Sequence, residues 1–326
     1  MPAHAEPPKP ANHRVVEIAA DKPRPAADQS RLILAVEHAQ TRIVLLDPDR
    51  PWTDPAAIVW EWRADTDPQA IAWEQRAEQA SPGVDRLPFF INPSDAKRVR
   101  GGTQILAIMC GGAATLIDVA TRRIVWLGAA GHNPHSITLL PHGCIATVSS
   151  TGGQLRLFQT DAAQPGVAVA EYSLFDGHGI HWDEKRQCLW ALGGPQLHRY
   201  RLHLEAGRPE LRFEWSRILA DIDTTKTQPS FNHGHDLATT GSPDAFYLTD
   251  ARRIWRFNAD EGTVRPASEL PLLADIKSVS RHPVTGQVIV QQPTESWWSD
   301  TLRDVDGKWT RTLPGARFYK ARWWVD

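Results

Sequence analysis

The chain alternates short runs of apolar, β-branched and aromatic residues with turns rich in Gly, Pro and Asp. In one such repeat, residues 135–140 form a first run, residues 141–143 form a turn, and residues 144–149 form a second run. Paired runs of this kind predict β-hairpins, and a third β-rich run follows most of the pairs. The same succession recurs from residues 178, 235 and 277. No long stretch has the 3.6-residue period of an amphipathic helix, so the pattern predicts an all-β chain.

Each repeat opens with a basic or imidazole residue, then a variable residue, and then usually an aliphatic one. The steps between these triplets are 38, 43, 57, 42 and 43 residues. A period near 40 with several short strands per repeat is typical of a β-propeller, in which four-stranded blades surround a central channel. The start of each innermost strand then faces the channel mouth. The six triplets begin at Lys97, His135, His178, His235, Lys277 and Lys320.

The two ends of the chain predict how the ring closes. Residues 31–36 and 42–46 have the pattern of a blade's second and third strands, and residues 317–324 have the pattern of a lone first strand. We therefore predict a six-bladed β-propeller over residues 29–326, closed by the C-terminal strand in the first blade. A seventh blade has one candidate, the segment from residue 67 to residue 93, which lacks paired β runs. Residues 1–28 are rich in Pro, Ala and charge and are predicted to be a flexible N-terminal segment.

Composition narrows the choice of partners. The 326 residues carry a formal net charge of −2, so the chain as a whole does not indicate nucleic-acid binding. No apolar run approaches the ~20 residues of a membrane span, and no nucleotide cofactor is expected. No hydrophobic signal region follows Met1, which leaves location open: secreted or periplasmic if a signal peptide was removed, otherwise cytoplasmic. Cys144 and Cys188 open equivalent strands in adjacent repeats and are predicted to be core cysteines rather than a disulfide.

Histidines gather in three loops that belong to consecutive repeats. Neutral imidazoles that converge from separate strands suit a divalent ion such as Mn²⁺, Zn²⁺ or Ni²⁺. The alternative is that each histidine only makes hydrogen bonds within its own blade. His178 and His181 are also candidates for acid–base catalysis. The predicted metal ligands are His135, His178, His233 and His235, and a further oxygen ligand or hydrogen-bond acceptor could come from Gln228, Asp236, Gln291 or Gln292.

Three of the triplets begin with lysine, and they fall on neighbouring blades once the ring is closed. Lys97, Lys277 and Lys320 would repel one another unless an anion lay between them, and no acidic residue shares their position in the triplets. We therefore predict that they bind a carboxylate, sulfate or phosphate together with Arg322, although Lys97 could also be an ordinary solvated charge. Lys277 is a catalytic candidate as well. Trp182 and the pair at residues 297 and 298 could stack on sugar rings, while most of the 14 Trp are expected to fill the space between blades.

The layout resembles that of bacterial six-bladed propellers in a domain-of-unknown-function family whose chains end in a strand similar to residues 318–323, and this resemblance implies the fold. More distantly, Gln228 and the His233-Gly234-His235 segment resemble the Gln-plus-His-x-His metal cluster of oligogalacturonide lyase, with a longer spacing after the Gln. In that family the metal engages a uronate carboxylate. Residues 135–143 are similar to a stretch of aryl sulfotransferase propellers, with Ser136 and His142 replacing that family's Asp and Asn.

These features predict a carbohydrate-active enzyme that acts on an acidic glycan at the channel mouth, specifically a metal-assisted, β-eliminating polysaccharide or oligosaccharide lyase. In such a reaction a cation neutralises the uronate carboxylate, a base removes the acidified C5 proton, and the 4-O group departs. One alternative is a non-catalytic propeller that binds an anionic sugar or a protein partner at the same mouth. Another is a His-based sulfuryl-transfer enzyme. Propellers serve both as enzymes and as scaffolds, so the fold does not decide between them.

Overall fold

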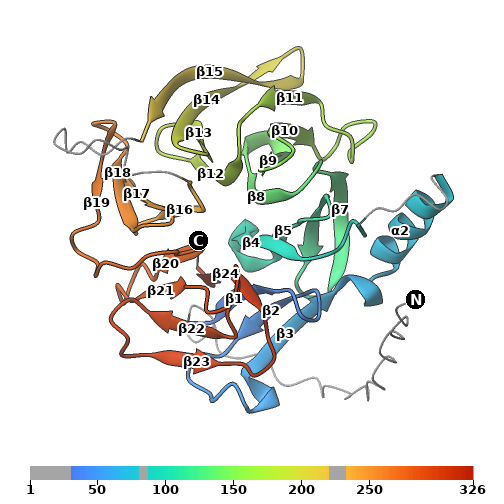
Figure 1. The fold of residues 1–326 in the computed structure, drawn as a ribbon. Helices are drawn as coiled ribbons and strands as arrows, with labels where there is room; N and C mark the ends of the chain where they lie inside the picture. The colour runs from blue at the N-terminus through green and yellow to red at the C-terminus, as the bar shows by residue number, and fades with distance from the viewer. Residues whose placement is uncertain (1–30, 81–86, 220–232, 326) are drawn as a thin grey trace, which may run out of the picture.

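A computed structural model describes residues 31–80, 87–219 and 233–325. In it, six four-stranded antiparallel sheets surround a central axis, which confirms the predicted six-bladed propeller (Figure 1). The segment at residues 1–28 that was predicted to be flexible lies outside the described residues. Within these ranges no helix is both long enough and apolar enough to cross a membrane.

The blades follow one another in chain order, and each runs from an innermost to an outermost strand. From the inside outward, blade 1 holds β24 (Phe318–Trp323), β1 (Ile33–Glu37), β2 (Arg42–Leu46) and β3 (Ile58–Arg63), and blade 2 holds β4 (Pro93–Val99), β5 (Gln104–Met109), β6 (Ala113–Asp118) and β7 (Arg123–Ala129). Blade 3 holds β8 (Pro134–Leu139), β9 (Cys144–Ser149), β10 (Gln154–Gln159) and β11 (Ala170–Ser173), and blade 4 holds β12 (Gly177–Asp183), β13 (Cys188–Gly193), β14 (Gln196–Glu205) and β15 (Arg208–Ile218). Blade 5 holds β16 (Asp236–Thr239), β17 (Ala245–Thr249), β18 (Ile254–Asn258) and β19 (Thr263–Pro266), and blade 6 holds β20 (Ser278–Arg281), β21 (Val288–Gln291), β22 (Thr301–Asp304) and β23 (Thr310–Thr312).

The ring closes through its two ends, as predicted. Strand β24 pairs antiparallel with β1, so that Ala321 lies opposite Ala35 and Trp323 lies opposite Ile33. Two chain ends almost 300 residues apart thus share one sheet, and this pairing covers an edge that β1 would otherwise expose.

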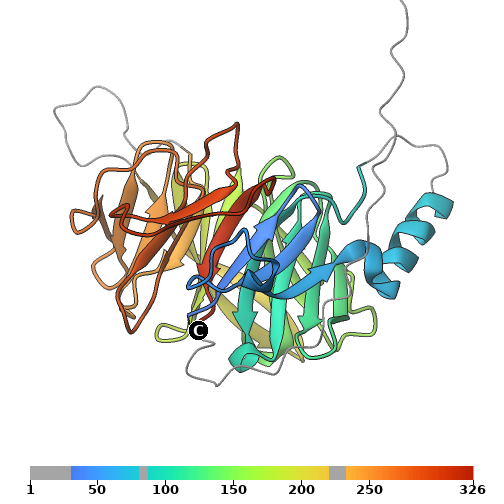
Figure 2. The same cartoon turned by 90° about the horizontal axis from the view of Figure 1, so that it is seen from below.

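One helix was not predicted. Helix α2 (Pro68–Ala80) occupies part of the segment that had been considered for a seventh blade, and it lies outside the ring of blades (Figures 1 and 2). Pro68 at the first helical position and the Asp67 carboxylate, which accepts hydrogen bonds from the backbone N–H groups of Gln69 and Ala70, explain where it begins. The short 3₁₀ turns are η1 (Pro55–Ala57), η2 (Ala64–Thr66), η3 (Arg100–Gly102) and η4 (Pro141–Gly143).

The core lies between the blades, where apolar faces of neighbouring sheets pack together. In one such interface the ring of Trp190 in blade 4 meets that of Phe257 in blade 5 edge-to-face, with 5.1 Å between ring centroids. Cys144 and Cys188 are free and fully buried in these interfaces, which confirms their prediction as core cysteines.

The six innermost strands share a β-bulge close to the channel mouth. In blade 4, for example, His178 is the extra residue between the pairs Gly177–Gly193 and Gly179–Leu192. In blades 5 and 6 the bulge is marked by a second backbone bond to the partner strand, from His235 to Thr249 and from Lys277 to Gln291. The equivalent residues at the six bulges are Ser94, His135, His178, His235, Lys277 and Tyr319.

Candidate functional site

The residues that face the channel form three rings, which are defined by their position relative to the bulge of each innermost strand. The residue two positions beyond each bulge is apolar and buried, and it packs between its own blade and the preceding one. The mouth ring consists of the bulge residues Ser94, His135, His178, His235, Lys277 and Tyr319. The middle ring consists of Asp95, Ser136, Gly179, Asp236, Ser278 and Lys320, and the lower ring consists of Lys97, Thr138, His181, Ala238, Ser280 and Arg322.

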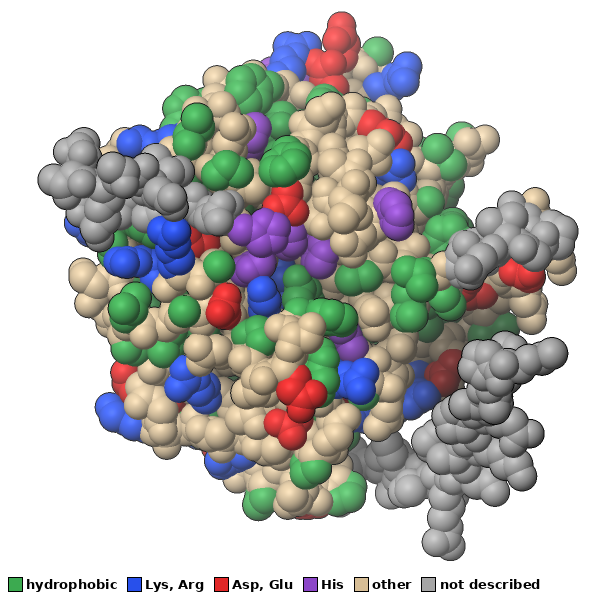
Figure 3. Space-filling view, in the orientation of Figure 1, with side chains coloured by type: hydrophobic (Ala, Val, Ile, Leu, Met, Phe, Trp, Pro, Cys, Tyr) green, Lys and Arg blue, Asp and Glu red, His purple; other side chains and the backbone are tan. Residues whose placement is uncertain are grey.

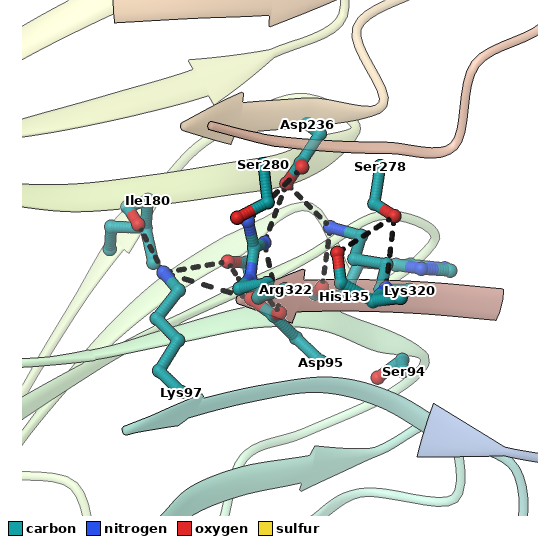
Figure 4. Close-up of polar contacts among 12 residues, drawn as sticks. Ser94, Asp95, Lys97, His135, Ile180, Asp236, Ser278, Ser280, Lys320 and Arg322 are labelled. Carbon is teal, nitrogen blue, oxygen red and sulfur yellow. Dashed lines mark hydrogen bonds and ion pairs between the residues drawn. The ribbon is translucent and has the colours of Figure 1, made fainter. Parts of the chain in front are cut away.

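An ion network across the middle and lower rings fills the channel below the mouth (Figure 4). The Arg322 guanidinium bridges two blades, with Nη2 at 3.0 Å from Asp95 Oδ1 and 2.7 Å from Asp236 Oδ1. The Lys320 ammonium donates to the backbone carbonyls of His135 (3.3 Å) and His178 (3.0 Å) and to Asp236 Oδ1 (3.4 Å). Both carboxylates are completely buried, so blades 1 to 5 are tied together at the axis by charged groups that are largely shielded from water.

This network corrects two expectations about the lysines. Lys97 and Lys320 do not belong to the mouth ring, because the bulges shift the register and place Ser94 and Tyr319 at the positions equivalent to the histidines. Nor are they without acidic partners: Lys320 contacts Asp236, and Lys97 Nζ lies 3.7 Å from Asp95 Oδ2 and donates to the Ile180 carbonyl at 2.6 Å. Of the three lysines, Lys277 alone faces the mouth pocket, while Arg322 is occupied by the two carboxylates.

The network also moves the pKa values of its members. Burial by itself would raise the pKa of Asp95, but the charges of Arg322 and Lys97 hold it well below its usual range. The same balance lowers the pKa of Asp236, with Arg322 as the main opposing charge. Burial lowers the pKa of Lys97 to about 8, although Asp95 opposes this. The three cations of the channel floor are therefore held by two buried carboxylates and by backbone carbonyls, and they do not form a free anion site.

Three histidines come together at the mouth. The side chains of His178, His233 and His235 each offer a ring nitrogen, and these atoms lie within 4.8 Å of one another. They belong to two adjacent blades, since His178 lies on β12 while His233 and His235 immediately precede β16. His178 and His235 are buried, whereas the His233 side chain is 44% exposed and opens the group to solvent. Figure 3 shows the histidine cluster (purple) near the middle of this face, beside Lys or Arg atoms.

Asp176 orients two of the three rings. The Nδ1 atom of His178 lies 3.0 Å from the Asp176 backbone carbonyl and 3.3 Å from Oδ1, and Nδ1 of His233 lies 2.5 Å from Oδ2. A carbonyl or carboxylate oxygen only accepts, so Nδ1 is the donor in both rings, and the neutral His178 ring keeps a free lone pair on Nε2. A carboxylate behind a histidine is the usual support of a metal-bound imidazole. The backbone of Asp176 has φ of 51°, a conformation rarely adopted by a residue with a Cβ.

Two further contacts at the mouth each join two side chains. His235 Nε2 lies 2.8 Å from Lys277 Nζ, while its Nδ1 is buried and has no hydrogen-bond partner within the described part of the chain. His135 does not join the group of three: its Nδ1 lies 3.0 Å from the Tyr319 hydroxyl, and its ring stacks on that of His178 with 4.4 Å between centroids. Burial lowers the pKa of His178 to about 4 and that of His235 to about 2, so both imidazoles are neutral near pH 7.

A pocket of about 430 Å³ opens above these residues. Blade 1 contributes His38 and Tyr319 to its wall, and Lys277 and Trp297 come from blade 6. The ion network occupies the channel below the pocket. The pocket itself has a polar floor of imidazoles and an aromatic wall. A pocket of this size with a few converging polar groups is a typical small-molecule site.

Other predicted residues lie elsewhere. His181 and Trp182 lie further along β12 and do not line the mouth pocket, and the Trp182 indole N–H donates to Glu184. The Gln291 and Gln292 amides donate to backbone carbonyls, which makes them structural in this arrangement. Gln228 lies outside the described residues. Whether any of the predicted site residues binds a ligand stays a prediction.

Three site residues escaped the sequence analysis: Asp176, Tyr319 and His38. Asp176 lies two residues before the candidate ligand His178, and Tyr319 lies directly before the candidate Lys320. A search for carboxylates within two residues of each candidate histidine would have found Asp176. His38 precedes the first predicted hairpin turn, and no local signal points to it.

The buried histidines predict a pH-dependent stability. Burial lowers the pKa of His181 to about 3, so below pH 6.5 the unfolded chain binds a proton that the folded protein does not accept. We expect the free energy of unfolding to fall as the pH drops from 6.5 toward 3, with His178 and His235 contributing in the same direction. Replacing His181 by Asn should remove about 1.4 kcal/mol per pH unit of this dependence, measured by urea unfolding between pH 4 and 6. The exposed turn residue His142, replaced by Asn, is the control, and equal slopes for H181N and wild type would contradict the expectation.

Comparisons with known proteins agree with the fold. Residues 24–326 match the model of DUF6528, a family of unknown function, and the chain belongs to this family. No curated protein sequence matches. Among solved structures, the β-propeller domain of Cps50 (Swd1) from Myceliophteria thermophila is similar with a TM-score of 0.52 and 10% identity, over 80% of this chain and 77% of that chain. Hydrazine synthase from Kuenenia stuttgartiensis reaches a TM-score of 0.47 and 10% identity, over 69% of this chain and 66% of that one.

Proposed function

We propose that this member of the DUF6528 family binds a divalent metal ion at the channel mouth and uses it to hold the carboxylate of an acidic sugar. The observation that carries the proposal is the group of His178, His233 and His235, with two of its rings oriented by one carboxylate. Three imidazole ligands with an open side toward a pocket are typical of catalytic rather than structural metal sites. Imidazole donors suit Zn²⁺, Ni²⁺ or Mn²⁺.

The reaction that we propose is β-elimination next to the uronate carboxylate. A bound divalent ion would supply Lewis-acid neutralisation of that carboxylate. Lys277 is the base in this proposal, because it faces the same pocket and burial lowers the pKa of its ammonium group. Its Nζ atom lies 2.8 Å from His235 Nε2, so the amine is held beside the proposed metal ligands. The C5 proton would pass to the Lys277 amine as the 4-O bond breaks and a C4–C5 double bond forms.

A second candidate is a non-catalytic propeller that binds an acidic sugar or a protein partner at the same mouth. The low pKa values of His178 and His235 favour it over a lyase in which either imidazole is the base, because imidazoles that are so difficult to protonate are weak bases toward a C–H bond. The sulfuryl-transfer alternative relies on His135, which is 9% exposed and covered by Tyr319 and His178.

Metal analysis of the purified full chain tests the site itself. We expect about one divalent ion per chain, and chelation should lower the melting temperature, because an ion that binds only the folded state stabilises it. Asp176→Asn should weaken metal affinity roughly 10- to 100-fold while leaving the ligands in place, and His178→Ala should weaken it further. His142→Ala, in an exposed turn, is the matched control. A protein that binds neither Zn²⁺, Mn²⁺ nor Ni²⁺ would refute the metal site.

The reaction is tested on a panel of uronic-acid polysaccharides by the ultraviolet absorbance of the unsaturated product. Product formation that is lost in Lys277→Met, with metal content unchanged, would support the lyase. Metal-dependent binding of the same glycans without any product would favour the non-catalytic candidate.

A further inference from the structure

Trp297 lines the mouth pocket although much of this large apolar residue is exposed to solvent. Its side chain is 49% exposed and yet lines the same pocket as His178, His235 and Lys277. The indole N–H donates to His38 Nδ1 at 3.4 Å, so the polar atom of this side chain already has a partner. What Trp297 can offer to a ligand in the pocket is therefore its apolar ring.

The indole is held in place by its neighbours. His38 Nε2 lies 2.9 Å from the Pro93 carbonyl, which requires the proton on Nε2 and leaves Nδ1 as the acceptor for Trp297. Burial lowers the pKa of His38 to about 4, so this neutral form persists near pH 7. The His38 ring also packs beside Tyr319, with 5.5 Å between centroids. One side of the pocket is thus a continuous aromatic wall.

The loop that carries Trp297 is equally constrained. Glu295 and Trp298 form a β-bridge with backbone bonds of 3.1 Å and 3.0 Å. The next ring, Trp298, lies under the Arg317 guanidinium, with Cζ 4.8 Å from its centroid. A flat apolar face held this rigidly loses little conformational entropy when a ligand covers it.

We propose that Trp297 is a stacking platform for the ring of a pyranose sugar acid whose carboxylate lies at the imidazole and Lys277 side of the pocket. The inference rests on the proposed function for the position of the carboxylate, and it adds the class of the ligand. A pyranose has an apolar patch of C–H groups on one face and polar groups around its edge. It therefore matches a pocket with an aromatic wall on one side and charged groups on the other.

The test is calorimetric titration of the full-length protein with three probes: galacturonate, its neutral counterpart galactose, and acetate. Galacturonate should bind more tightly than either of the others, because only it engages both sides of the pocket. Trp297→Ala should weaken galacturonate binding roughly tenfold or more, the effect of losing one stacked ring. Metal and acetate affinities should not change. Trp297→Phe keeps an aromatic face and should retain most of the galacturonate affinity, and Phe213→Ala, an exposed aromatic on the outer strand β15, is the matched control.

The outcomes separate this inference from the metal site. Unchanged galacturonate affinity in Trp297→Ala, no binding of galacturonate by wild type, or galacturonate binding no tighter than acetate would each overturn the platform. Galactose binding as tight as that of galacturonate would also overturn the assignment of a sugar acid. Trp297-dependent galacturonate binding by a protein that takes up no metal would uphold the platform and count against the metal proposal.

Discussion

Deletion of residues 317–326 should abolish the cooperative unfolding transition of this protein. The deletion removes β24, which pairs with β1 from Ile33 to Glu37 and is the link between the two ends of the ring. It also removes Lys320 and Arg322, and so leaves Asp95 and Asp236 without two of their cationic partners. The truncated chain would expose the full edge of β1 and would leave Asp236 without a cationic partner and Asp95 with Lys97 alone, and both effects favour aggregation or unfolding.

Thermal melting followed by circular dichroism measures this effect. A chain that lacks only residues 325 and 326 keeps all of β24 and serves as the control, with a transition close to that of wild type. A synthetic peptide of residues 317–326 added to the truncated chain should restore a transition whose midpoint rises with peptide concentration. A truncated chain with an unchanged melting curve would show that the ring does not depend on its closure.

The fold could be predicted from the sequence because it repeats. Apolar runs separated by turns recur about every 40 residues, and the unpaired first strand at residues 317–324 complements the incomplete blade at residues 31–46. Helix α2 could not be predicted in the same way, because it is too polar to show a helical period and packs on a single edge of the ring. Its capping residue Asp67 and Pro68 were the available signals.

The candidate site was predicted only in part, and the bulges explain why. Residues in one ring of the channel occupy the same position relative to the bulge of their strand. The sequence analysis instead matched the repeats by the basic or imidazole residue that opens each triplet. For His135, His178, His235 and Lys277 the two criteria agree. On β4 and β24 the bulge residues are Ser94 and Tyr319, which are not basic. The sequence analysis chose the nearby lysine of each strand instead. A bulge adds one residue without changing the local pattern of side-chain types, so the shift is not visible in a single sequence.

Asp95 and Asp236 show the same limit for electrostatics. Asp95 lies two residues from Lys97 and Asp236 follows His235, yet their shortest ion pairs come from Arg322, which approaches from blade 1 across the axis. Pairing across a closed ring links residues that are more than 80 positions apart in the chain. The sequence could indicate that basic residues converge, but not that buried carboxylates converge with them.

Arg322→Met should destabilise the protein by about 3–5 kcal/mol, the usual cost of removing one partner from a buried ion network. Arg322 donates to Asp95 through Nε and Nη2 and to Asp236 through Nη1 and Nη2, at 2.7 to 3.2 Å. Both carboxylates are completely buried, and Lys97 and Lys320 each reach only one of them. Methionine has a similar length but no charge, so the loss should reflect the hydrogen bonds that the two buried carboxylates no longer receive rather than a cavity.

Urea unfolding at neutral pH measures the change in the free energy of unfolding. Arg63→Met is the matched control: its partner Asp65 is 61% exposed, and loss of such a surface pair should cost at most about 1 kcal/mol. Adding Asp95→Asn and Asp236→Asn to Arg322→Met should not restore stability, because Lys97 and Lys320 would then be buried without a carboxylate partner. The penalty of Arg322→Met should shrink as the pH falls below 4, where the pKa values of these carboxyl groups, no longer lowered by the guanidinium, allow them to be protonated. A loss below about 1 kcal/mol, equal to that of the surface control, would mean that the carboxylates remain hydrated and that the network does not hold the blades together at the axis.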